Sequence, residues 1–386
     1  MKLELIATSA FGLEAVVRRE IEALGYKVLK TEDGRVTYMG DERAIVRSNL
    51  WLRSADRVYV RMGEFEAKEF EELFQQTKAL EWESIIPLGG AFPVVGGSVK
   101  SALHSVPACQ KIIKKAVSSR LGEFYFKEQL PESGAEYRIR FIAHKDSFVL
   151  LLDASGVGLH KRGYRVQDTA APMKETLAAA LVRLSFYNKD RVLVDPCCGS
   201  GTIPIEAAMI ARNIAPGLSR TFAAEKWDII PSKIWKEERR AAFEAIDSGL
   251  DRLVIAAMDI DKRAVRAAKA NAEEAGVADD IDIICKDMTT WVPGGGIPKG
   301  VTSDEHGVII SNLPYGIRIG DDKENKAIYA HIKELMESCP NWSFFLITAD
   351  KSLEKEIGRK ADRRRKLYNG QIETQFYQFH GLKPSR

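Results

Sequence analysis

Long apolar runs are missing from this sequence. Its longest apolar stretches, such as residues 344–348, have the length of a β-strand, whereas a membrane helix needs about 20 apolar residues. Residues 1–6 contain no apolar signal core, and no cleavage site follows them. We therefore expect a cytoplasmic protein that has no membrane partner.

Cysteine is also scarce, with five residues in a chain of 386. The number is odd and no pair has the C-x-x-C spacing, which argues against both a disulfide framework and a zinc site. We therefore expect no bound metal, and we expect each cysteine to be a small buried side chain and not a reactive thiol. The cysteines are Cys109, Cys197, Cys198, Cys285 and Cys339.

The chain has little excess charge of either sign, because its formal net charge is only +3. The charges are nevertheless unevenly distributed. Residues 64–83 hold seven acids, residues 99–127 hold six bases against one acid, and residues 363–366 are all basic. Basic patches on a nearly neutral protein suit local contact with phosphate, although they are equally typical of solvated helix faces.

What is present is the composition of a soluble globular protein, with 45% hydrophobic residues and a length sufficient for two or three domains. The pattern changes near residues 156–165. Before this point short strands and amphipathic helices are mixed, and after it strands alternate with helices as in a parallel sheet. The later strands are predicted at residues 191–195, 253–259, 281–285, 307–311, 343–348, 366–368 and 371–379.

Asn369 and Gly370 separate the last two predicted strands. Both residue types accept the positive φ of a type I′ turn, so the sheet is predicted to end in an antiparallel hairpin. A mostly parallel sheet with such a hairpin at its edge is the common topology of methyltransferases. Residues 214–250 interrupt the alternation as an insertion that contains Pro and Trp and then becomes helical and charged.

The sharpest local signal is the segment 194–202, Val-Asp-Pro-Cys-Cys-Gly-Ser-Gly-Thr. A hydrophobic strand leads into Asp195, a turn of small residues and then a predicted helix. Gly199 and Gly201 let the backbone approach a ligand at the carboxyl end of the strand, where open α/β sheets bind their ligands. The phosphate-loop pattern is absent, and an acid at this position would repel phosphate. A cofactor with an amino group and a sulfonium therefore fits better than a nucleoside triphosphate.

Acids also follow the next two predicted strands. Asp259 is the kind of residue that accepts hydrogen bonds from ribose hydroxyls. Asp261, two residues later, has a helix N-cap as its rival role. Asp287 could accept a hydrogen bond from an adenine amino group. Three acids after three successive strands are a much more specific signal than any one of them.

The fourth strand of this series runs into Asn312-Leu313-Pro314-Tyr315. This segment brings together a side-chain carbonyl, a backbone carbonyl fixed by the following proline, and an aromatic ring. Two acceptors can hold the hydrogens of an amino group while the ring stacks on a base. The segment therefore predicts a site that receives an exocyclic amine.

With these motifs the chain resembles the class I methyltransferases that combine a THUMP domain with an Asn-Pro-Pro-Tyr motif. This family includes bacterial 23S rRNA guanine-N2 methyltransferases and tRNA guanine-N2 relatives. The first motif matches residues 195–202, the acidic motifs match Asp259 and Asp287, and the catalytic motif matches residues 312–315. Residues 159–165 and 171–178 resemble the family's lead-in segment, which lies against the cofactor, and residues 99–115 resemble the THUMP module. The departure is Leu313, where proline is commonest and where leucine is expected to loosen the turn.

The resemblance implies a Rossmann-like, seven-stranded C-terminal methyltransferase domain at residues 158–386, preceded by a ferredoxin-like segment at 1–64 and a THUMP RNA-binding domain at 65–157. It also implies S-adenosylmethionine as cofactor and RNA as partner. The residues expected to bind the cofactor are Asp195, Cys197, Gly199, Gly201, Thr202, Asp259, Ile260, Asp287, Met288 and Asn312. The catalytic set is Asn312, Leu313, Pro314 and Tyr315, and the RNA-binding set is Lys100, Lys111, Lys114, Lys115, Lys161 and Arg162.

Three functions stay open at this point. The first is transfer of a methyl group to the N2 amino group of a guanine in structured RNA, in 23S rRNA or alternatively in tRNA. The second is an adenine-N6 DNA methyltransferase, which shares the four-residue catalytic motif, although the THUMP-like module favours RNA. The third, a non-catalytic RNA-binding protein, is disfavoured because every cofactor motif is intact.

Overall fold

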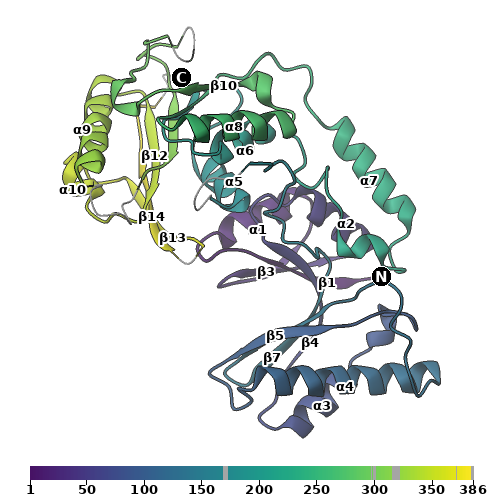
Figure 1. Cartoon of the computed structure of the whole chain (residues 1–386). Coiled ribbons are helices and arrows are strands. Elements are labelled where there is room, and N and C mark those ends of the chain that lie inside the picture. Colours follow the sequence, from purple (N-terminus) through teal and green to yellow (C-terminus); the bar gives the residue numbers. More distant parts are fainter. Residues whose placement is uncertain (168–172, 297, 299–300, 315–321, 371, 384–386) are drawn as a thin grey trace. The chain divides into compact units, whose positions relative to one another are not determined.

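The computed structural model describes residues 1–167, 173–296, 298, 301–314, 322–370 and 372–383 (Figure 1). The chain forms two compact units, each built from discontinuous segments. The first unit contains Met1–Ser9, Val17–Leu159 and Arg220–Ala241, and the second contains Ala10–Val16, His160–Ser219 and Ala242–Arg386. In the described part of the chain, no helix combines the length and apolarity that crossing a membrane requires.

The first unit is built on one seven-stranded sheet with the order β2-β3-β1-β4-β7-β6-β5. Its strands are β1 (Leu3–Thr8), β2 (Val28–Glu32), β3 (Arg35–Gly40), β4 (Arg57–Glu66), β5 (Val94–Val99), β6 (Ile139–His144) and β7 (Ser147–Asp153). Its helices include α2 (Glu42–Trp51), α3 (Phe70–Lys78) and α4 (Val106–Tyr125), while α1 (Glu14–Ala23) begins in the second unit. Strands β5 and β6 pair in parallel, whereas the other strand pairs described for this sheet are antiparallel.

Strand β4 joins the two halves of this sheet. Its first residues pair with β1, and its residues from Tyr59 to Glu66 pair with β7, with a bulge between Arg61 and Gly63. Tyr59 and Val60 pair with both neighbours, and the ten-residue length of β4 lets the strand continue along β7 to Glu66. The ferredoxin-like and THUMP-like halves therefore share one continuous sheet, and residue 64 lies inside a paired strand.

The insertion predicted at residues 214–250 contributes to the core of the first unit. It contains a short 3-10 helix (Ala223–Lys226) and α7 (Ser232–Glu244). Trp227 is 1% exposed, its ring stacks on Tyr137 with the centroids 5.2 Å apart, and its Nε1 donates to the Glu136 carbonyl at 3.1 Å. Arg43 of α2 forms ion pairs with both Glu237 and Glu238 of α7. The first unit is thus completed by residues that follow the first methyltransferase motif in sequence.

The second unit is built on a seven-stranded sheet with the order β10-β9-β8-β11-β12-β14-β13. Its strands are β8 (Leu193–Asp195), β9 (Ile255–Asp259), β10 (Ile281–Cys285), β11 (Val308–Asn312), β12 (Ser343–Thr348), β13 (Arg363–Asn369) and β14 (Ile372–Phe379). Its helices are α5 (Glu175–Leu184), α6 (Thr202–Ala211), α8 (Lys262–Glu274), α9 (Asp322–Ser338) and α10 (Leu353–Ile357). The strands from β8 to β12 run parallel, and β14 runs antiparallel between β12 and β13.

Helices cover both faces of this sheet, so its central strands are apolar on both sides. Alternate residues of β11 enter different cores: Val308 and Ile310 pack with α5 and α6, whereas Ile309 packs with residues of α9. All six residues of β12 are buried. This arrangement confirms the predicted fold class, a mostly parallel sheet with an antiparallel terminal hairpin.

The terminal hairpin turns one residue later than the sequence predicts. Asn369 pairs with Ile372 and therefore belongs to β13, so the predicted Asn369-Gly370 turn is wrong. Gly370 has the positive φ, +63°. Asn369 is 9% exposed, and its place in the strand removes it from the turn.

Candidate active site

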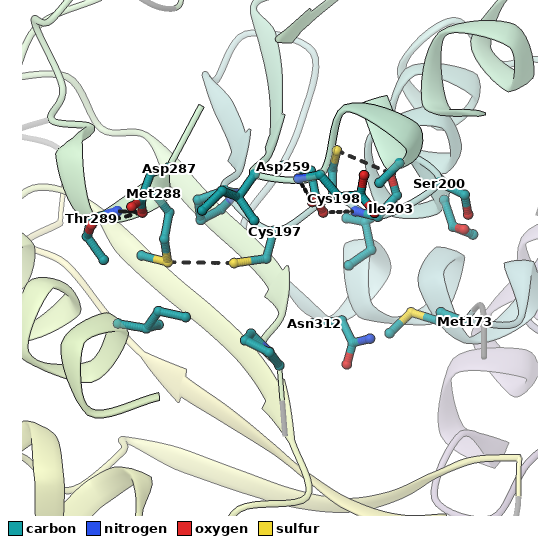
Figure 2. A pocket seen from close by; sticks show the side chains of 18 of the residues that line it. Met173, Cys197, Cys198, Ser200, Ile203, Asp259, Asp287, Met288, Thr289 and Asn312 are labelled. Carbon is teal, nitrogen blue, oxygen red and sulfur yellow. Dashed lines mark hydrogen bonds between the residues drawn. The ribbon is translucent and has the colours of Figure 1, made fainter. Parts of the chain in front are cut away.

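A cavity of about 580 Å³ lies at the carboxyl ends of the parallel strands of the second unit (Figure 2). The turns after β8, β9, β10 and β11 all contribute to its wall, which places the four sequence motifs around one space. The predicted site residues that line it are Cys197, Gly199, Thr202, Asp259, Ile260, Asp287, Met288, Asn312 and Pro314. Asp195 and Gly201 lie directly behind this wall, and Tyr315 is outside the described residues.

Asp195 ends β8 and is 1% exposed. Its Oδ1 accepts hydrogen bonds from the Ser311 hydroxyl at 2.7 Å and from the backbone N–H of Cys197 at 3.2 Å. Burial raises the pKa of Asp195 to about 7, and the nearby Asp259 adds to the rise although both hydrogen bonds oppose it. A cation bound next to this carboxyl group would favour its charged form.

The two glycines of the β8–α6 turn have different roles. Gly199 has φ +54°, in the left-handed region, with open space where a Cβ would lie. Gly201 caps α6 with φ +83°, and a Cβ there would lie 3.0 Å from the Cβ of Ala268 on α8. Gly201 therefore permits both the turn and the close approach of two helices.

The acids after β9 and β10, Asp259 and Asp287, line the cavity and also accept hydrogen bonds from nearby backbone N–H groups. Asp259 accepts from the N–H groups of Gly199 and Asp261, both at 2.9 Å, and so connects the β8 and β9 turns. The N-cap role predicted as the alternative for Asp261 is confirmed. Asp261 is the N-cap of α8, and its side chain accepts a hydrogen bond from the Arg263 N–H. Asp287 accepts from the N–H and the hydroxyl of Thr289 at 2.9 and 2.8 Å.

Asn312 is the last residue of β11, and its side chain and that of Met173 point toward one another in Figure 2. Its Oδ1 atom is buried and accepts no hydrogen bond from the described residues. A buried amide oxygen without a donor is costly unless a ligand supplies one. Asn312 is therefore the residue of this cavity best prepared to accept a hydrogen bond from a bound group.

The side chain of Leu313 is fully buried in the core on the α9 side of the sheet, and its N–H donates to the Ile347 carbonyl at 3.0 Å. Residues 315–321 lie outside the described residues, so the expectation that leucine loosens the turn stays a prediction. Pro314, by contrast, lines the cavity.

Two sulfur-containing side chains form part of the cavity wall. The Cys197 Sγ and Met288 Sδ atoms are 3.6 Å apart (Figure 2). Burial raises the pKa of Cys197, so its thiol stays protonated. The expectation that every cysteine is buried fails at Cys285, which is exposed at the end of the edge strand β10.

The predicted RNA-binding residues fall into two groups. Lys100, Lys111, Lys115 and Lys161 are exposed. Lys114 forms an ion pair with Glu132, and its Nζ lies 3.7 Å from the centre of the Phe92 ring. The assignment of Arg162 to RNA contact is wrong, because its side chain is 2% exposed and pairs with the fully buried Glu206. A guanidinium enclosed in this way cannot reach a phosphate.

Several cavity residues carry no chemical signal in the sequence. Ala327 and Ile328 reach the cavity from α9, and Ala264 reaches it from α8. Small and apolar residues on helices are ordinary core residues until the fold shows otherwise. Met173 could have been found, since it lies in the lead-in segment that resembles a cofactor-contacting part of the family.

The strand order, the glycine turn and the acids at successive strand ends define a class I methyltransferase. A sequence model described as the RMKL-like methyltransferase domain matches residues 162–378, more than half of the chain. The chain belongs to this family, as the sequence motifs predicted. Models of the RlmL ferredoxin-like domain and of the THUMP domain match residues 4–59 and 67–153.

Full-length relatives share this organisation. The chain is 46% identical to "Putative RNA methyltransferase YpsC" of Bacillus subtilis (strain 168), over 100% of this chain and 98% of that protein. A crystal structure described as a "predicted N6-adenine-specific DNA methylase" from Listeria monocytogenes str. 4b F2365 is 44% identical, with a TM-score of 0.91 over 99% of this chain and 97% of that one. The structure of SMU.472, "a putative methyltransferase complexed with SAH", is 42% identical, with a TM-score of 0.92 over 100% and 99% of the two chains.

Proposed function

We propose that this protein transfers a methyl group from S-adenosylmethionine to the exocyclic N2 amino group of a guanine in structured RNA, and that the RNA is 23S rRNA. The observation that carries the proposal is the buried Oδ1 atom of Asn312, which has no donor among the described residues and belongs to the cavity wall. The THUMP match and the name of the Bacillus relative support RNA as the substrate. The SAH in the SMU.472 structure supports the cofactor.

The residues around the cavity fit this cofactor. S-adenosylmethionine would supply an electrophilic methyl group attached to a sulfonium. Asp195 provides a buried acid behind the cavity wall, and Asp259 and Asp287 supply acceptors for hydroxyl and amino groups. Ile260 is 69% exposed, an unusual exposure for isoleucine at a cavity, and offers an apolar surface for a flat base.

The chain's own residues mainly position the amine. Asn312 Oδ1 accepts one amine hydrogen, and a backbone carbonyl of the Asn312–Pro314 segment is expected to accept the other. The nitrogen lone pair then points toward the methyl donor. Holding two reactants in line can supply several kcal/mol of the barrier reduction, so a strong acid or base is unnecessary. Tyr315, expected to stack on the base, lies outside the described residues.

The direct test is identification of the product. The purified protein, incubated with S-adenosylmethionine and 23S rRNA from cells that lack the gene, should yield N2-methylguanosine after nuclease digestion and mass spectrometry. Methylation of tRNA but not rRNA would support the tRNA alternative. N6-methyladenosine as the product would contradict the guanine assignment and favour the adenine activity in the name of the Listeria protein.

Cofactor binding should tighten as the pH rises toward 8. Asp195 has a pKa of about 7 in the free protein, and a cationic ligand binds better to its deprotonated form. Below pH 7 the dissociation constant for S-adenosylmethionine should therefore fall about tenfold for each unit by which the pH rises. Above pH 7 it should become independent of pH. Calorimetry in buffers with different ionisation enthalpies would measure how many protons Asp195 releases when the cofactor binds.

Asp195→Asn is the control for this pH dependence, because an amide oxygen can still accept from Ser311 and Cys197. The variant should bind more weakly and without the step near pH 7. In the free wild-type protein the same raised pKa makes the unfolding free energy fall between about pH 4 and pH 7, since only the folded state retains the proton. A wild-type dissociation constant that stays flat from pH 6 to 8 would contradict this role.

Charge reversal on α4 should weaken RNA binding. Lys111 and Lys115 are exposed and four residues apart, so they share one helix face. Lys111→Glu with Lys115→Glu should lower RNA affinity and reduce the salt slope by about 1.4, or 0.7 for each lost phosphate contact on a single strand. Salt-dependent binding assays would measure both. Cofactor affinity should not change.

The matched control reverses Lys236 and Lys333, which are exposed lysines on α7 and α9. It changes the net charge by the same amount, so it separates a local contact from general attraction. Wild-type affinity and salt slope in the α4 variant would show that these lysines only solvate the helix. The RNA surface would then be sought first on β13, at residues 363–366.

A further inference from the structure

Asn271, which does not line the cavity, connects the β8–α6 turn, which does, with residues 166–167. Its Oδ1 accepts from the N–H groups of Val166 and Gln167 at 3.0 and 3.1 Å. Its Nδ2 donates to the carbonyls of Gln167 and Ser200, at 3.1 and 3.0 Å. Ser200 belongs to the β8–α6 turn, whereas Val166 and Gln167 directly follow residues 159–165 of the lead-in segment. One amide thus uses all four of its ordinary hydrogen bonds to hold two backbone segments.

The position of Asn271 gives it no evident role in helix stability. It is 1% exposed within α8, where the neighbouring buried residues Ala267, Ala268 and Ala272 are all alanine. Asparagine is a poorer helix former than alanine, and a buried amide is costly unless fully bonded. We therefore attribute the presence of Asn271 among these alanines to its hydrogen bonds with the two segments that it contacts.

The hydrogen bond from Asn271 to Ser200 reaches a part of the chain that lines the cavity. Ser200 lies between Gly199 and Gly201, which both have positive φ. The hydrogen bond from Asn271 fixes the peptide plane between Ser200 and Gly201, and Gly201 already lies close to Ala268 of the same helix. The conformation of the turn is therefore held from α8 by a residue that does not itself line the cavity.

Arg165 holds the lead-in segment at a second point. Its Nη2 donates to the Met173 carbonyl at 2.7 Å and to the Thr202 hydroxyl at 3.2 Å, and its Nε lies 3.2 Å from a carboxylate oxygen of Glu175. Met173 and Thr202 both line the cavity. Arg165 therefore fixes Met173 against the start of α6, on the same wall that Asn271 fixes at Ser200.

We propose that Asn271, with Arg165, is a positioning residue for cofactor binding: it holds the glycine turn and the lead-in segment together as one wall of the cavity. The inference rests on the proposed function, because it assigns the cavity to S-adenosylmethionine. Losing the contact should weaken cofactor binding more than it slows the methyl transfer itself, since Asn312 and the amine site are left in place.

The test compares Asn271→Asp and Asn271→Leu in the full-length protein, with S-adenosylmethionine as the probe. Aspartate keeps the two acceptor bonds but loses both donor bonds, and leucine loses all four. The dissociation constant from calorimetry should rise about tenfold or more for either variant, and further for leucine. The KM for S-adenosylmethionine should rise in parallel, while kcat at saturating cofactor should stay within about threefold of the wild-type value.

Hydrogen exchange of the cofactor-free protein gives a readout that does not depend on activity. The amide of Gln167 should lose protection in Asn271→Leu and largely keep it in Asn271→Asp, because only the aspartate variant retains its acceptor. The Val166 amide also donates to the Tyr164 carbonyl, so its loss of protection should be smaller. Asn49→Asp in the first unit is the matched control. Asn49 is also 1% exposed and bonds to Ile45 and Ser155, so its variant should lose stability without changing cofactor affinity.

Wild-type cofactor affinity in folded Asn271→Asp would overturn the inference. If neither Asn271 variant folds, Arg165→Lys provides the same test, because a single ammonium cannot reproduce the contacts to Met173, Thr202 and Glu175. Unchanged affinity in that variant would equally overturn it. If the wild-type protein itself fails to bind S-adenosylmethionine, the proposed function fails, and this result is distinct from either outcome.

Discussion

Asn312→Ala is expected to lower kcat by about 10²–10³ while the dissociation constant for S-adenosylmethionine changes by less than about threefold. An acceptor that acts on the reacting amine is most important in the transition state, and one such preorganised group typically contributes this much. The structure supports this role because the Oδ1 atom is already buried and has no donor among the described residues. Single-turnover kinetics with saturating RNA would measure the effect.

The control for this experiment is Asn341→Ala. Asn341 donates to the Asp304 carbonyl on the exposed surface of the same unit, and it is not part of the cavity wall. Its variant should keep the wild-type kcat. If Asn312→Ala retained more than about a tenth of the wild-type kcat, Asn312 would not be the residue that holds the amine.

Trp227→Ala is expected to reduce the stability of the first unit by about 3–5 kcal/mol, the usual cost of truncating a large buried aromatic residue. The Trp227 ring stacks on Tyr137, whose hydroxyl in turn accepts from Asp228 N–H at 3.2 Å. Removing the ring would leave a cavity in the core of the first unit and leave the Glu136 carbonyl without its indole donor. Hydrogen exchange of β7 amides would report the loss for this unit separately.

The same packing predicts that residues 1–157 will not fold stably as an isolated fragment. A version in which residues 214–250 are joined to this fragment by a flexible linker should show a cooperative unfolding transition. Phe243→Ala is the control, because Phe243 is 67% exposed on α7 and should change stability by less than about 0.5 kcal/mol. A stable, cooperatively folded 1–157 fragment would contradict the role assigned to the 220–241 segment.

Local patterns were sufficient to predict the catalytic sheet. The strands predicted at residues 281–285 and 343–348 are observed with the same limits. Both segments have the length of a strand and are followed by turn residues. Residues 343–348 are buried throughout, whereas in the edge strand β10 the buried Ile281 and Ile283 alternate with less buried residues. The residues at strand ends were predictable for the same reason, since parallel strands bring their carboxyl ends to one edge.

Contacts between residues distant in sequence were not predictable in this way. Arg162 looked like a surface base, and only the fold shows Glu206 beside it in the buried interior. Asn271 carried no signal at all, because the three residues to which it makes four hydrogen bonds lie more than 70 residues away in the chain. A charge or an amide has the same appearance in sequence whether it faces water or a buried partner.

The sequence by itself determined the methyltransferase family, the order of strands and helices in the second unit, and the residues placed at the carboxyl edge of its sheet. These follow from periodicity and from residue types that a turn or a strand end requires. Tertiary structure alone decided that β14 lies between β12 and β13, that one sheet joins both N-terminal halves, and that residues 220–241 complete the first unit. Each of these depends on which apolar surfaces pack together. A large apolar side chain such as Trp227 or Phe222 can be buried against many partners, and only the folded chain selects one of them.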